Sequence, residues 1–199
     1  RLPDDGRLPA LPSGVADTVG RRLARLEPET RELARTAAVL GKHLNRGMWL
    51  AVSGLDKDAF LDRLEQLVER QFVARDGARL AFPHDRVRET LYLDLEPAER
   101  ASLHGRCGRY LEGLQAGTDA LVNKLAHHFG RSDDAAKGFR YARLAGDRAR
   151  DAGMALTALR HWQVAADRLA ELPGPASEEA RRALRRDIGE TGYTAWPEP

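Results

Sequence analysis

The sequence of 199 residues predicts a mainly α-helical protein, in which a small domain with one β-hairpin precedes a series of helical hairpins. Two observations lead to this fold class. Apolar residues recur at helical spacing through most of the chain, and the dipeptide Asp76-Gly77 separates two short apolar segments. The length allows one large domain or two small ones, and we place the two parts at 15–95 and 96–199.

Residues 1–14 are rich in proline and glycine and have no apolar periodicity, so we expect an extended linker there. The chain starts at Arg1 without a methionine and finishes on the segment 196–199, which contains two prolines. We therefore expect this chain to be a segment of a longer polypeptide.

Helices are expected at 15–26, 28–40 and 56–70, with a short apolar segment at 48–52. Pro28 suits the first turn of a helix, and Asp56 can cap the third one. Asp76-Gly77 favours a tight turn between strands at 72–75 and 78–82. Three helices followed by a hairpin is the order of a winged-helix domain, which we assign to 15–95.

After His84 the periodicity is helical to the end, and we expect no further strand. One helix follows His84, another opens at Pro97, and four more are expected at 119–130, 136–152, 154–171 and 177–190. Across the expected helices 136–152 and 154–171, small residues surround one large aromatic, Trp162, in the spacing of a tetratricopeptide repeat. These small residues are Gly146, Ala149, Gly153, Ala155, Ala158 and Ala165. We assign 96–199 to such repeats.

Composition excludes several classes of protein. The formal net charge of +2 is too small to attract nucleic acid or anionic membranes to the whole molecule. A lone cysteine, Cys107, excludes an internal disulfide and is expected to be a buried small hydrophobe. There is no apolar run long enough to span a membrane, and we expect a cytoplasmic protein without membrane contact.

No pattern for catalysis is found, and we expect no enzymatic activity and no catalytic residue. Gly41-Lys42 lacks the earlier glycine of a phosphate-binding loop and is followed by His43. His127 and His128 are adjacent on an expected helix and should point apart, so we expect no metal site and assign the histidines to surface or interhelical polar contacts.

A winged-helix domain that binds DNA is the main alternative, because such domains often place their third helix in the major groove. Here the segment 56–70 carries five acidic residues against three basic ones, which disfavours contact with phosphates. Basic residues near the hairpin keep this alternative open: Arg75, Arg79, Arg86 and Arg88.

Several segments together resemble one family, the STAND signalling ATPases, which occur in large LuxR-type bacterial transcription activators and in kinase- or cyclase-linked regulators. The most specific segment is Phe82–Tyr92. The others are Leu11–Pro12, Arg22–Leu26, Pro28–Leu33, Ala37–Gly41, Arg100–His104, Leu125–Phe129 and Tyr141–Ala149.

The resemblance implies that an ATPase core in the same polypeptide precedes this chain and binds ADP or ATP, while the chain itself holds no cofactor. It also implies that the winged helix contacts that core and that the repeats bind a protein partner or effector ligand. His84 and Asp85 match a short motif whose histidine contacts the β-phosphate of ADP in the resting state. A purely structural interpretation stays open, in which Asp85 caps a helix and His84 packs inward at its start.

Overall fold

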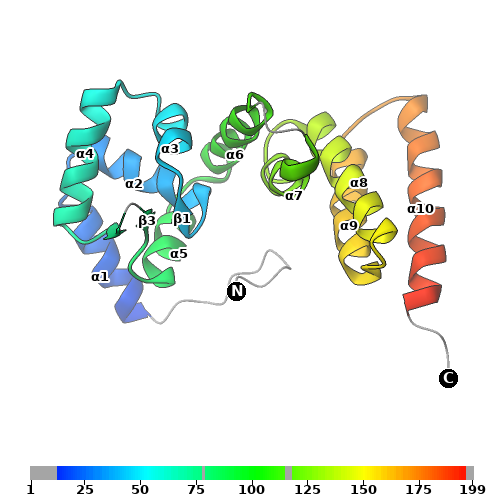
Figure 1. Ribbon diagram of the computed structural model, residues 1–199, viewed down its shortest axis with the longest axis horizontal. Coiled ribbons are helices and arrows are strands. Elements are labelled where there is room, and N and C mark those ends of the chain that lie inside the picture. Colours follow the sequence, from blue (N-terminus) through cyan, green and yellow to red (C-terminus); the bar gives the residue numbers. More distant parts are fainter. Residues whose placement is uncertain (1–12, 78, 115–117, 196–199) are drawn as a thin grey trace. The chain divides into compact units, whose positions relative to one another are not determined.

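The computed structural model describes residues 13–77, 79–114 and 118–195, which form two compact units (Figure 1). The first unit ends at Glu96 and the second begins at Pro97, one residue beyond the domain boundary expected from the sequence. Most of the linker expected at 1–14 lies outside the described residues, and its last two residues are helical instead, because the first helix begins at Ser13.

The first unit contains five helices and a small sheet within its described part. The helices are α1 (Ser13–Leu23), α2 (Pro28–Leu40), α3 (Arg46–Ser53), α4 (Lys57–Glu69) and α5 (Asp85–Leu93), and the strands are β1 (His43–Leu44), β2 (Ala74–Asp76) and β3 (Arg79–Ala81). Asp56 caps the start of α4 as predicted, since its carboxylate accepts hydrogen bonds from the backbone N–H groups of Asp58 and Ala59 at 3.0 and 2.9 Å.

The sheet is antiparallel with the strand order β1-β3-β2. The hairpin predicted around Asp76-Gly77 is present, but its turn lies one residue farther along the chain. Asp76 pairs with Arg79, so Asp76 belongs to β2 rather than to the turn, and Gly77 follows it with φ 57°. The strand β1 was not predicted, because two residues are too few to show an alternating pattern. With β1 included, the order α2, β1, α3, α4, β2, β3 is that of a winged helix.

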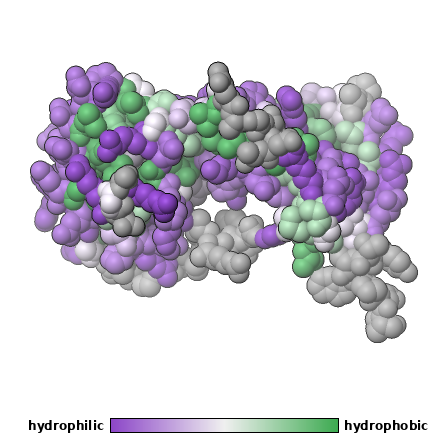
Figure 2. Space-filling view, in the orientation of Figure 1, coloured by the Kyte–Doolittle hydropathy of each residue, from purple (hydrophilic) through white to green (hydrophobic). Residues whose placement is uncertain are grey.

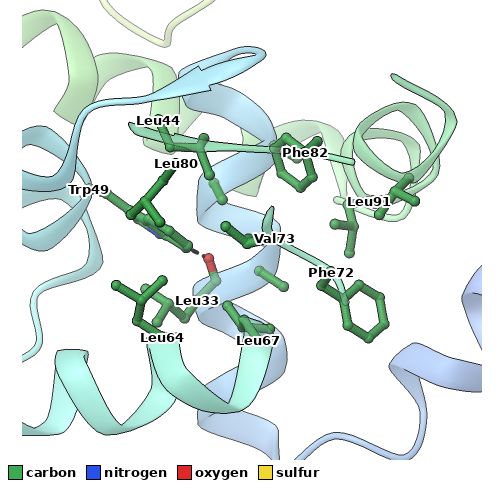
Figure 3. Close-up of a cluster of buried hydrophobic side chains, with 14 of the residues drawn as sticks. Leu33, Leu44, Trp49, Leu64, Leu67, Phe72, Val73, Leu80, Phe82 and Leu91 are labelled. Carbon is green, nitrogen blue, oxygen red and sulfur yellow. Dashed lines mark hydrogen bonds between the residues drawn. The ribbon is translucent and has the colours of Figure 1, made fainter. Parts of the chain in front are cut away.

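The core of the first unit lies between α2, α3, α4 and the sheet (Figure 3). Trp49 is fully buried, and its indole N–H donates to the carbonyl oxygen of Leu33 at 3.0 Å, shown as the dashed line in Figure 3. Its ring is perpendicular to that of Phe60, at a centroid distance of 5.5 Å. The only indole in this core therefore has both apolar packing and a satisfied donor.

The second unit consists of consecutive helices, each packed against the next. They are α6 (Pro97–Glu112), α7 (Thr118–Phe129), α8 (Ala135–Asp151), α9 (Ala155–Ala170) and α10 (Pro175–Ala195), close to the expected ranges. As predicted, Trp162 of α9 fills the space between α8 and α9 and is fully buried. A Cβ atom at Gly146 would lie 2.3 Å from its ring, so only glycine allows this close approach.

The outer surface is mostly hydrophilic in the face that Figure 2 shows. Among the described residues, no helix is long and apolar enough to cross a membrane.

Candidate functional site

His84 and Asp85 lie where β3 leads into α5, and both side chains are exposed. His84 occupies the N-cap position with an extended backbone, φ −141° and ψ 138°, but its side chain makes no capping hydrogen bond. Asp85 is the first residue of α5 and forms an exposed ion pair with Lys42 at 3.5 Å. The structural interpretation of the motif is therefore wrong in both parts, because Asp85 does not cap the helix and His84 does not pack inward.

A cavity of about 360 Å³ lies beside His84. Its walls combine three polar side chains with apolar ones, and the lining residues are Arg22, Val68, Gln71, Val73, Ala74, Pro83, His84 and Val87. This volume falls within the range of small-molecule sites, as does the combination of apolar walls with a few polar groups.

The Arg22 guanidinium at this cavity is held in place from two sides. It donates a hydrogen bond to the backbone carbonyl of Arg70 at 2.5 Å and lies over the Phe72 ring, 4.9 Å from the centroid. Figure 3 shows Phe72 and Phe82 within the core of the unit, so the segments leading into and out of the hairpin are both anchored. A positive charge fixed in this way favours an anionic ligand.

Gln71 has a left-handed backbone with φ 56°, the one such residue other than glycine in the described chain. This conformation costs a side chain of this type of the order of 1 kcal/mol. It follows directly after the C-cap of α4 and turns the chain toward β2. Sequence reasoning missed Gln71, since glutamine is not a residue that signals a left-handed position, and it treated Arg22 only as part of the resemblance.

Three basic residues of α4, the hairpin and α5 are paired with neighbouring acids. Arg63 of α4 is paired with Glu29 of α2, and Arg75 of β2 approaches Glu65 of α4 at 3.7 Å. Arg86 pairs with Glu89 of its own helix at 3.2 Å. The expected basic patch beside the hairpin is further reduced because the fourth residue of that group, Arg88, is buried.

In the second unit, three histidines come together. His104 of α6 and the neighbouring residues His127 and His128 of α7 each place one ring nitrogen within 4.8 Å of the others. The expectation that the adjacent pair points apart is wrong. The expected interhelical contact is confirmed for His104 and His128, whose Nδ1 atoms are 3.1 Å apart.

Cys107 is fully buried on α6, as expected, and burial raises the pKa of its thiol to about 12. A neutral thiol without solvent access has no role as a nucleophile.

Comparisons with known protein families, with curated proteins and with solved structures found no match for this chain.

Proposed function

We propose that this chain is a non-catalytic regulatory and protein-interaction region of a STAND-type signalling ATPase. In this proposal the winged helix contacts an ATPase core of the same polypeptide, and the helical repeats bind a protein partner or effector ligand. The order of elements supports it, because a unit of five helices and a small three-stranded sheet precedes a series of packed helix pairs. The proposal places the protein in the cytoplasm, where ATP is available to the core.

The observation that carries this proposal is the position of His84. An exposed imidazole at the start of α5, beside a cavity that also contains Arg22, can be approached by a ligand held on another domain. Its ring nitrogen can donate to a phosphate oxygen of ADP, and a hydrogen bond to a charged group contributes about 1.5–3 kcal/mol. This corresponds to a change of about one to two decades in a two-state equilibrium.

The test is the variant His84→Ala in the longer protein that contains the ATPase core. We expect ADP to dissociate about tenfold to a hundredfold more readily and basal activity to rise. The matched control is His43→Ala, which removes an exposed histidine from β1 of the same unit. If the His84 variant keeps the ADP affinity and basal activity of the unchanged protein, the contact with nucleotide does not exist.

Partner binding by the repeats is supported by exposed apolar side chains where α9 begins. Met154 is 51% exposed and Leu156 is 59% exposed. We expect Leu156→Asp to weaken the response to the effector while leaving ADP affinity unchanged. Leu114→Asp, at an exposed leucine that follows α6, should leave the response intact. A Leu156→Asp protein that still responds fully would place the partner elsewhere.

DNA binding by the winged helix is the alternative function, and it rests on Arg75 and Arg79 at the hairpin. The ion pairs of Arg63 and Arg75 with acidic neighbours disfavour it. Titration of the chain with duplex DNA at moderate salt should give only weak, salt-dependent association. A tight and sequence-selective complex would establish the alternative.

A further inference from the structure

The three histidines of α6 and α7 form a compact group of side chains whose ring nitrogens can bind a metal ion, and the proposed function does not use them. His104 and His128 are buried, with 1% and 5% of their surfaces exposed, whereas His127 is exposed. Their ring centroids are 5.1 to 5.7 Å apart in all three pairs. The group therefore joins two helices and opens to solvent on one side.

This spacing agrees with metal coordination. A zinc ion binds imidazole nitrogen at about 2.0–2.1 Å, so two ligands of a tetrahedral site lie about 3.3 Å apart. The Nδ1 atoms of His104 and His128 are already 3.1 Å apart, and one nitrogen from each of the three rings lies within 4.8 Å of the other two. His127 is exposed, so its ring has room to turn toward the other two and supply the third ligand.

We propose that His104, His127 and His128 form a binding site for one zinc-type divalent cation, with water in the fourth position. Three histidines and one water is a known arrangement for zinc. The exposed side of the group, at His127, provides both the entry path and the place for the water. The ion would hold α6 and α7 together through side chains from both helices.

The contact between the two buried rings is compatible with a metal, because binding requires only a change of tautomer. One Nδ1 donates to the other in the metal-free protein, and that proton moves to Nε2 of the same ring when both Nδ1 atoms bind the ion.

Positive charge near the site opposes binding and limits the affinity. The Arg131 guanidinium lies 3.2 Å from Nδ1 of His127, and Arg100 and Lys124 also contribute positive charge to the surroundings of the buried pair. A cation has to displace the guanidinium or use Nε2 of His127. Removing the charge of Arg131 should consequently strengthen binding, which a purely structural group of histidines would not show.

The experiment is a calorimetric titration of the full chain with Zn²⁺ alone. We expect saturation at one ion per chain. His127→Ala should weaken binding at least about tenfold, because loss of a side chain that only supports a metal ligand already costs about 10–100-fold. This position is exposed, so folding of the variant is easily checked by circular dichroism. The control, His43→Ala, removes an exposed histidine from the other unit and should leave the affinity unchanged.

Two further measurements make the outcome decisive. Arg131→Gln should tighten binding by about threefold to tenfold through loss of the nearby charge. Co²⁺ in place of Zn²⁺ should give the intense visible bands of a tetrahedral site, and His127→Ala should abolish them. The absence of saturable binding, or an affinity that neither His127→Ala nor Arg131→Gln alters, would show that the group is only a hydrogen-bonded contact between helices.

Discussion

The contact between Gly146 and Trp162 allows the packing of α8 against α9 to be tested with a single methyl group. Gly146 lies inside α8 and is buried, and its missing Cβ would be 2.3 Å from Cδ1 and 2.4 Å from Nε1 of the Trp162 ring. The ring cannot turn away freely, because it is fully buried and its N–H donates to the Asp147 carboxylate at 3.0 Å. The variant Gly146→Ala therefore forces α8 and α9 apart.

The expected effect is the sum of two opposing contributions. Alanine stabilises a helix by about 1 kcal/mol relative to glycine. Overpacking of a closely packed core costs about 1–3 kcal/mol, and a contact far inside van der Waals distance belongs at the upper end of that range. We therefore expect Gly146→Ala to lower the free energy of unfolding by about 1–2 kcal/mol.

The assay is urea unfolding of the full chain followed by far-ultraviolet circular dichroism. Gly189→Ala is the matched control, because this glycine also lies in a helix, α10, but a Cβ atom there meets nothing within 4 Å. The control should be as stable as the unchanged chain or more stable by up to about 1 kcal/mol. If Gly146→Ala is as stable as Gly189→Ala, then Trp162 does not fill the space between the two helices as described.

Three other properties follow from the structure. Asp56→Ala removes the cap of α4 and should lower the free energy of unfolding by about 1 kcal/mol in thermal or urea unfolding. The Cys107 thiol should not react with a thiol reagent until urea unfolds the second unit, because it is fully buried with its pKa raised to about 12. The pKa of His128 is lowered from 6.5 to about 4, so between these values the unfolded state binds more protons than the folded state. The free energy of unfolding should therefore be highest above pH 6.5 and fall as the pH drops toward 4. Urea unfolding midpoints at several pH values will measure this change.

Much of the fold could be predicted because local signals agreed with the packing. Pro28 begins α2, Asp56 caps α4, and the small residues around Trp162 do lie where α8 and α9 meet. The prediction failed where the sequence pattern is short or ambiguous. The strand β1 has two residues, and its pairing with β3 depends on a contact between positions 43 and 81 that no local pattern reveals.

The sequence indicated only part of the candidate site beside His84. The resemblance singled out His84 and Asp85, but no local rule predicted that Gln71 would adopt a left-handed backbone or that Arg22 would line the same cavity. Arg22 lies in α1 and Gln71 lies just after α4, and both precede the motif in the sequence by more than ten residues. A cavity is formed by surfaces of several elements, so its lining follows from tertiary packing rather than from residue spacing.

The histidine group shows how an argument from helix geometry can fail. Adjacent residues on a helix diverge at the Cβ atom, but an imidazole ring reaches several bonds farther, and two rings can meet again around a third side chain. His104 supplies that third side chain from α6, and its contact with His128 holds one ring of the adjacent pair in the interface. The ring of His127 lies beside this pair, so that one nitrogen from each of the three rings lies within 4.8 Å of the others. Spacing within one helix therefore does not exclude a metal site when a second helix contributes a donor, and the titration with Zn²⁺ tests this directly.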